Sequence, residues 1–165
     1  MQSHPIKKII THDPTGTDSN DISYHITRVR VPLFEVDLGQ AVYHGNYFHL
    51  FELGREDFLR KIGFPYREFM NREMHLAVVE SSCNYRRPLR YDDEIDIHTA
   101  FTWIKTRSLG MVQKIYREKE RGEKELCTSV DFNMVCVRFS GPPAVLPEDF
   151  RTLAKDFVEK GGSHD

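Results

Sequence analysis

The sequence of 165 residues has no long hydrophobic run and almost no excess of charge of one sign. A membrane-spanning helix needs roughly 20 consecutive apolar residues, and no such run occurs in the chain. The polar start MQSHPIKKIITHDPTGTDSN lacks the apolar centre of a secretory signal. The formal net charge of −2 provides no basic field for a nucleic acid. We therefore expect no membrane span and no nucleic-acid partner.

Cysteine and the common cofactor motifs are also scarce. Cys83, Cys127 and Cys136 include no CxxC pair and cannot all pair with one another, which is typical of reduced thiols in a cytoplasmic protein. The ten glycines never adopt the spacing of a phosphate-binding loop, and no GxSxG or HExxH motif occurs. The sequence therefore predicts neither a metal nor a bound cofactor.

The composition favours one globular domain, because 39% of the residues are hydrophobic and 29% are charged. Residues 1–23 are rich in Thr, Asp, Ser and Gly and show no period, so we predict a flexible N-terminal extension. The folded domain is expected over residues 24–150. Residues 151–165 are predicted to form a C-terminal helix or tail.

Two hydrophobic periods follow each other at the start of this domain. Alternating residues from Tyr24 predict a strand with Val29, Val31 and Leu33 on one face. A long helix is predicted from about Asn46 to Gly63, because apolar residues recur there at helical spacing. These residues are Tyr47, Leu50, Phe51, Gly54, Phe58 and Ile62.

Strands dominate the rest of the chain. After a short second helix that opens at Pro65, four strands follow from Met74 with short connections between them. The second of the four is expected to place Ile95, Ile97, Thr99, Phe101 and Trp103 on one side. Short connections imply antiparallel pairing. The sequence thus predicts an α+β fold in which a five-stranded antiparallel sheet wraps around one long central helix.

One carboxylate, Asp37, stands just before the predicted helix start in the stretch EVDLGQAVYHGNYF. A helix start offers free N–H groups and the positive end of its dipole, which can polarise a carbonyl oxygen. Asp37 could then attack the carbonyl carbon or activate a water molecule. The plain alternative is a turn residue, because Asp followed two positions later by Gly is common in turns. The residues alone leave both roles open.

A resemblance to a known family is carried by two segments, YHITRVRVPLFEVDLGQAVYHGNYFHLFELGREDFLRKIG and YRRPLRYDDEIDI. Together they resemble the hot-dog-fold acyl-CoA thioesterases, in the group typified by 4-hydroxybenzoyl-CoA thioesterase and the Tol-Pal-associated thioesterase. The likeness runs from about Tyr24 to about Phe150. Its most specific part is the pattern met by Asp37, Val42, Tyr43, His44 and Tyr47. The resemblance implies a cytoplasmic homo-oligomer, a dimer or tetramer, that hydrolyses acyl-CoA or acyl-carrier-protein thioesters without a metal or cofactor.

The resemblance also implies roles for individual residues. Asp37 would be the nucleophile or general base, and the backbone N–H of His44 would polarise the carbonyl. The side chains of Tyr43 and His44 would line the thioester, with Glu52 a second acidic candidate from the helix. The substrate-binding candidates are Gly45 and Tyr47 at the helix start and Arg86, Arg87, Lys105 and Arg107, whose charges suit the phosphates of coenzyme A. Each of these four basic residues has a plain alternative as a solvated surface residue.

Two positions depart from the family pattern. Val36 stands where relatives often have Thr or Cys, and Gln40 stands where a glycine is common. Both changes bear on the shape of the acyl group that would fit. A non-catalytic acyl-CoA or acyl-carrier binding module on the same fold is the alternative function, and a hot-dog dehydratase ranks below it. The acyl group and its carrier are left open.

Overall fold

The computed structural model describes residues 24–158. The predicted extension over residues 1–23 and the last residues of the predicted tail lie outside this range. The helices and strands are β1 (His25–Arg30), α1 (Tyr47–Lys61), α2 (Arg67–Asn71), β2 (Met74–Tyr85), β3 (Glu94–Ile104), β4 (Ser108–Glu118), β5 (Lys124–Arg138) and α3 (Glu148–Ala154). None of the helices in the described range is long and apolar enough to cross a membrane.

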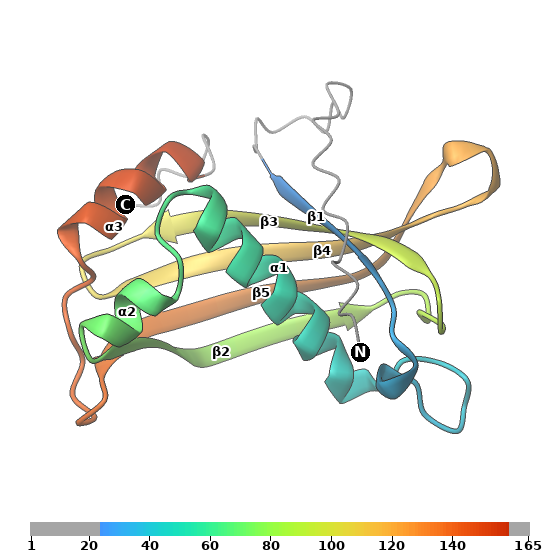
Figure 1. Cartoon of the computed structure of the whole chain (residues 1–165), viewed down its shortest axis with the longest axis horizontal. Coiled ribbons are helices and arrows are strands. Elements are labelled where there is room, and N and C mark those ends of the chain that lie inside the picture. Colours follow the sequence, from blue (N-terminus) through green and yellow to red (C-terminus); the bar gives the residue numbers. More distant parts are fainter. Residues whose placement is uncertain (1–23, 159–165) are drawn as a thin grey trace, which may run out of the picture.

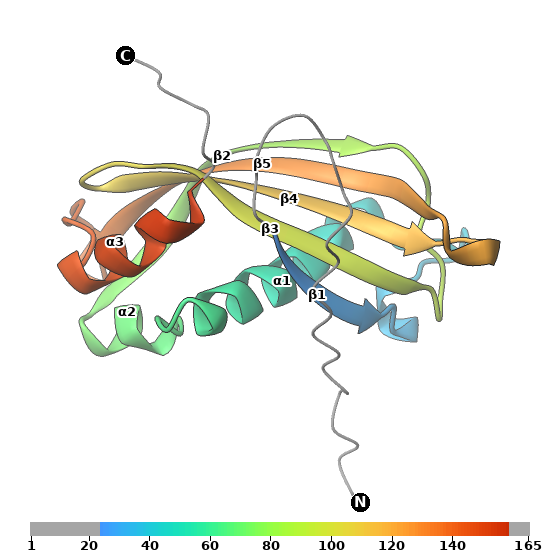
Figure 2. The ribbon, with the colours of Figure 1, turned by 90° about the horizontal axis from the view of Figure 1, so that it is seen from above.

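The five strands form one antiparallel sheet in the order β1-β3-β4-β5-β2, so β1 and β2 are its edges. Helix α1 crosses one face of this sheet, from the end of β2 towards β3 and β1 (Figures 1 and 2). The α+β prediction of a five-stranded sheet around one long helix is therefore confirmed.

The predicted helical stripe is the buried face of α1. Its members, Tyr47, Leu50, Phe51, Gly54, Phe58 and Ile62, are all buried. At Gly54 the helix approaches the sheet so closely that an added Cβ would lie 2.6 Å from Cγ2 of Ile97. Beside this contact, Nε2 of the buried Gln113 donates to the Phe51 carbonyl at 2.8 Å and to the Thr99 hydroxyl at 3.0 Å. The middle of α1 is thus fixed against β3 and β4.

Two side-chain placements predicted from alternation are wrong. Leu33 does not share the strand face of Val29, because the chain leaves β1 at Pro32 and turns through a 3-10 helix, η1 (Leu33–Glu35), which leaves Leu33 66% exposed. Trp103 does not share the face of Phe101, because a β-bulge between them places Trp103 opposite Gly110. Alternation fails wherever the register shifts by one residue.

The C-terminal helix belongs to the same core. The predicted boundary between residues 150 and 151 falls inside α3, whose Phe150 is fully buried. The Phe150 ring lies 5.1 Å from the Phe69 ring and 5.2 Å from the Phe64 ring, centroid to centroid. The folded domain therefore continues through α3.

Gly54→Ala should destabilise the protein although alanine is the better helix former by about 1 kcal/mol. The added methyl group would overlap Ile97 and would also lie 3.0 Å from Nε2 of Gln113. Overpacking of this kind costs about 1–3 kcal/mol. Urea unfolding checks this, with Lys61→Ala on the exposed surface of the same helix as the control. A Gly54→Ala protein as stable as the wild type would contradict the close approach.

Candidate functional site

The loop that carries Asp37 is a tight hairpin held by backbone hydrogen bonds. The Tyr43 N–H donates to the Glu35 carbonyl at 3.0 Å, and the Asp37 N–H donates to the Ala41 carbonyl at 3.0 Å. The chain reverses at Gln40, which adopts a positive φ of 60°. The base of the loop thus packs on the core through Val36 and Val42, while its tip, residues 37–40, is exposed.

Asp37 has the turn geometry that its sequence context predicts. Its Oδ1 accepts the N–H of Gly39 at 2.7 Å, which closes the turn. The side chain is exposed in the single chain, and Oδ2 accepts no hydrogen bond from any residue in the range 24–158. The turn role is confirmed, whereas the catalytic role stays a prediction.

The helix start directs its free N–H groups outward. A 3-10 turn, η2 (His44–Asn46), precedes α1, and the Asn46 N–H donates to the Tyr43 carbonyl at 2.8 Å. In a trans peptide the C=O and the N–H point in opposite directions. Since the Tyr43 carbonyl points into the turn, the His44 N–H of the same peptide points out of it. This is the orientation that a carbonyl-polarising amide requires.

Tyr85, at the end of β2, is a residue that the sequence interpretation missed. Its hydroxyl donates to the His44 carbonyl at 2.8 Å, across 41 residues of sequence. Burial raises the pKa of Tyr85 to about 12, so the hydroxyl keeps its proton at neutral pH. The Tyr85 ring meets the Tyr47 ring edge-on at 5.1 Å between centroids, and the Tyr47 hydroxyl accepts the Leu89 N–H at 3.0 Å. No local pattern in the sequence indicates this contact.

A second contact that the sequence did not predict joins Glu35, at the base of the Asp37 loop, to α1. The carboxylate of Glu35 is buried and lies 3.0 Å from Nδ1 of His49 on the first turns of α1. The Glu35 carbonyl also accepts a hydrogen bond from the Asn46 side chain at 3.2 Å. Both contacts tie the base of the Asp37 loop to the helix start.

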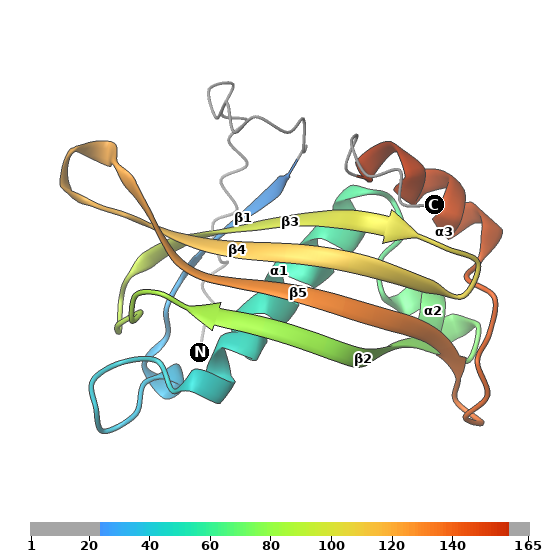
Figure 3. The same cartoon turned by 180° about the vertical axis from the view of Figure 1, so that it is seen from behind.

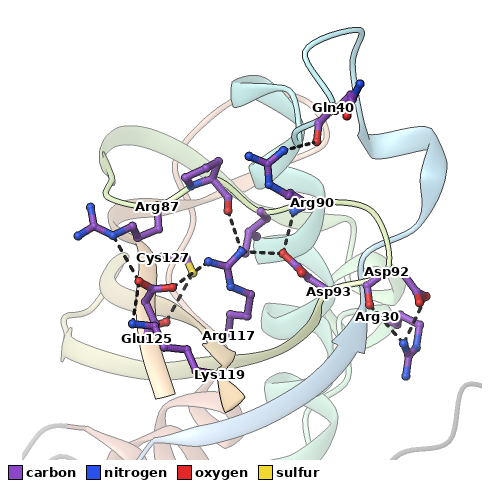
Figure 4. A network of polar contacts seen from close by, with 12 residues as sticks. Arg30, Gln40, Arg87, Arg90, Asp92, Asp93, Arg117, Lys119, Glu125 and Cys127 are labelled. Carbon is purple, nitrogen blue, oxygen red and sulfur yellow. Dashed lines mark hydrogen bonds and ion pairs between the residues drawn. The ribbon is translucent and has the colours of Figure 1, made fainter. Parts of the chain in front are cut away.

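Charged side chains from the β2–β3 connection, β4 and β5 form a network that also contacts the Asp37 loop (Figure 4). Nη1 of Arg90 donates to the Gln40 carbonyl at 3.2 Å, and the Arg90 N–H donates to Asp93 at 2.8 Å. Asp93 also accepts from Arg117 at 3.0 Å, and the other branch of Arg117 donates to Glu125 at 2.8 Å. The hydrogen bond from Arg117 lowers the pKa of the Glu125 carboxyl. The turn at Gln40 is thereby connected to β4 and β5.

The remaining predicted site residues do not all come together in one chain. Tyr43 and His44 are exposed, with ring centroids 4.2 Å apart, and Glu52 is exposed on α1. Arg86 and Arg87 follow the end of β2, at the end of the sheet where the Asp37 loop lies, and Nε of Arg87 donates to Glu125 at 3.3 Å. Lys105 and Arg107 lie in the β3–β4 turn at the opposite end (Figure 1).

Comparison with known proteins places the chain among thioesterases. The family model described as the thioesterase-like superfamily matches residues 31–153. The acyl-CoA thioester hydrolase YbgC of Escherichia coli O157:H7 is 30% identical over 109 residues, which cover 66% of this chain and 78% of that protein. A provisionally named esterase of Aquifex aeolicus is 40% identical over 73 residues. That alignment covers 44% of this chain and 57% of the Aquifex protein, less than two thirds of its length.

The solved structures agree with the sequence matches on the fold. A structure of 4-hydroxybenzoyl CoA thioesterase in complex with 4-hydroxybenzoyl CoA superposes with a TM-score of 0.73. The superposition covers 79% of this chain and 98% of that one, at 18% identity. This likeness confirms the predicted hot-dog arrangement of sheet and helix.

Glu125→Gln should reduce the loss of stability in acid. The folded-state pKa of Glu125 lies below its ordinary value of about 4.3, so its stabilising effect is complete above that value and is lost as the pH falls through the lowered pKa. We expect a shallower fall of the unfolding free energy between about pH 5 and pH 2 in the variant. Denaturant unfolding across this range measures the slope. Glu123→Gln, in the same hairpin, is the control, because Glu123 forms no ion pair within residues 24–158. Equal slopes for the wild type and Glu125→Gln would contradict the interpretation.

Proposed function

Because the chain belongs to the thioesterase-like superfamily, we propose that it hydrolyses acyl-CoA thioesters to a free acid and the thiol of coenzyme A. The acyl-CoA thioester hydrolase of E. coli, which aligns over 66% of this chain, supports this substrate class. The observation that carries the proposal is the pairing, on one hydrogen-bonded hairpin and helix start, of an accessible carboxylate with the outward-pointing His44 amide.

In the proposed reaction, the thioester oxygen accepts hydrogen bonds from the N–H groups of His44 and Gly45. Negative charge on that oxygen is stabilised there as the carbonyl carbon is attacked. Asp37 acts in one of two ways. Its free oxygen attacks the carbon, expels the thiolate and leaves an anhydride that water hydrolyses, or it removes a proton from a water molecule that attacks directly. Either path consumes one water molecule and gives the acid and the thiol.

We propose that a second copy of the chain completes this site. Edge strand β2 has twelve residues, and on its outer side it has no neighbouring strand within residues 24–158. Val78 and Val79 on this strand are exposed. Unpaired edges of this length invite pairing with another strand. Pairing of two β2 strands about a two-fold axis would join the sheets of a homodimer. It would also cover the surface near Asp37, where Leu38 is fully exposed.

The same two-fold axis would give a role to all four basic candidates, Arg86 and Arg87 after β2 and Lys105 and Arg107 between β3 and β4. It would turn the partner's Lys105 and the partner's Arg107 towards the end where Asp37 lies, which is where Arg86 and Arg87 follow β2. Phosphate groups of coenzyme A at the mouth of the site would then meet basic residues from two chains.

Asp37→Asn should lower kcat for thiol release by roughly a hundredfold or more, because an amide can neither attack nor accept the proton. A panel of short, long and aromatic acyl-CoA esters, read by a thiol reagent, measures this and also identifies the acyl class. Asp131→Asn, an exposed acid on β5, is the matched control and should keep wild-type rates. Equal rates for Asp37→Asn and the wild type would remove Asp37 from the reaction. Tight binding of the esters by the wild type without turnover would favour the binding-module alternative.

Tyr85→Phe should lower kcat about two- to tenfold with little change in KM. The variant loses only the hydroxyl that holds the His44 carbonyl, and a hydrogen bond of this kind contributes about 0.5–1.5 kcal/mol. Steady-state kinetics on the best ester of the panel measures the effect. Tyr91→Phe, an exposed tyrosine in the β2–β3 connection, serves as the control. Unchanged kcat in Tyr85→Phe would show that the hydrogen bond has no part in catalysis.

A further inference from the structure

Arg55 on α1 is a partly buried cation that forms no ion pair with a carboxylate of residues 24–158. Its guanidinium carbon lies 5.2 Å from the centroid of the Phe132 ring. Within residues 24–158 its N–H groups donate to no acceptor and it forms no ion pair. Arg28, by contrast, is bound to Asp96 through two hydrogen bonds, at 2.7 and 3.0 Å. Burial lowers the pKa of Arg55, and the nearby carboxylates of Glu52 and Glu56 offset this effect only in part.

Glu52 lies one turn earlier on the same helix. Its side chain is exposed, and it forms no ion pair within the described range. The two residues are three positions apart, a spacing at which side chains can meet on a helix. Glu52 is close enough to act on the charge of Arg55, but the guanidinium lies over the Phe132 ring and the two side chains form no ion pair, so each can take a partner from another molecule.

The fold places this pair of charges near the middle of the free edge. Phe132 of β5 is the register partner of Ser81 on β2, and Ser81 is close to the centre of Met74–Tyr85. Helix α1 begins beside Tyr85, and its later residue Phe58 packs on Phe101 of β3. Helix α1 therefore starts beside β2 and runs away from this edge towards β3 (Figures 1 and 3), and Glu52 comes before Arg55 along it.

The partner that fits these charges is a second copy of the same chain. A two-fold axis beside the centre of β2 brings the same surface of both copies together. Every contact between two different residues across such an interface therefore occurs twice. With strands about 4.8 Å apart, Phe132 lies roughly 7 Å from such an axis. Glu52 is displaced towards the axis by up to about 4.5 Å along the helix. Extended Glu and Arg side chains span the separation that remains.

We propose that Arg55 of each protomer forms an ion pair with the partner subunit's Glu52, so that two identical pairs flank the two-fold axis. This inference rests on the homodimer proposed above and assigns Glu52 a role in assembly. Two opposite charges that are both removed from water at an interface couple strongly, and the loss of one leaves the other buried and unpaired. The positions of Glu52 and Arg55 along α1 therefore determine which molecule binds at this edge and in which orientation it binds.

Charge reversal tests the pair. Arg55→Glu and Glu52→Arg should each raise the dimer dissociation constant by about tenfold or more, because each brings like charges together at both pairs. The double variant Glu52→Arg/Arg55→Glu restores opposite charges and should return to within about threefold of the wild type. Sedimentation velocity over a dilution series measures the dissociation constants. Arg60→Glu makes the same change of charge on the exposed end of the helix and should leave the constant unchanged.

Neutral variants keep the test valid if a reversal disturbs folding. Arg55→Met preserves the packing on Phe132, and Glu52→Gln preserves the shape of Glu52. If the two residues pair, the double neutral variant should weaken the dimer little more than either single variant. Reversals that leave the dissociation constant unchanged, or a double reversal no tighter than the weaker single one, would overturn the inference. A wild type that stays monomeric would overturn it together with the dimer, whereas thiol release by that monomer would leave the hydrolase proposal intact.

Discussion

The close approach of α1 to the sheet at Gly54 is the constraint on which the candidate site depends. The helix meets Ile97 there without an intervening side chain, and Gln113 connects its backbone to the sheet beside this contact. A helix held at its middle can neither slide nor rotate, so its start is fixed beside the end of β2. The position of the His44 amide is therefore a consequence of core packing, and its direction follows from the turn at the helix start.

The loop around Asp37 is held in a different way. Its shape comes from backbone hydrogen bonds within the hairpin, from Glu35 below it and from Arg90 at its turn. Such a loop can keep a fixed form while its apolar residues, among them Leu38, stay exposed. Leu33, Phe34 and Leu38, close to Asp37 in sequence, are exposed large apolar residues. In a single chain the acid consequently faces solvent although its position is defined.

Periodicity in the sequence was sufficient for the architecture and for the position of Asp37 just before the long helix. The stripe from Tyr47 to Ile62 and the short connections after Met74 led to the sheet, the helix and the location of Asp37 at the helix start. Trp103 was misplaced because a bulge adds one residue, which no alternation reveals. Tyr85 was missed because its contact with His44 depends on how far β2 extends, a tertiary quantity that local patterns do not contain. The proposed contribution of a second chain to the site is a further feature that a single sequence does not display.

The charges of the protein divide into two groups with different physical consequences. Arg117 and Arg28 have carboxylate partners in the same chain, and their ion pairs brace the sheet of a single copy. Glu52 and Arg55 act on each other but form no ion pair in the described range, and they lie near the centre of the free edge. Strand pairing alone is tolerant of register, because a slip by two residues restores the backbone hydrogen bonds and the side-chain faces. A slip of this size in a β2–β2 pair moves opposite charges apart by about 7 Å, beyond the contact distance of an ion pair. The charges of Glu52 and Arg55 would thus fix the register of the β2–β2 pair, which backbone hydrogen bonds alone do not specify. They would thereby also align the parts of the proposed site that the two chains contribute.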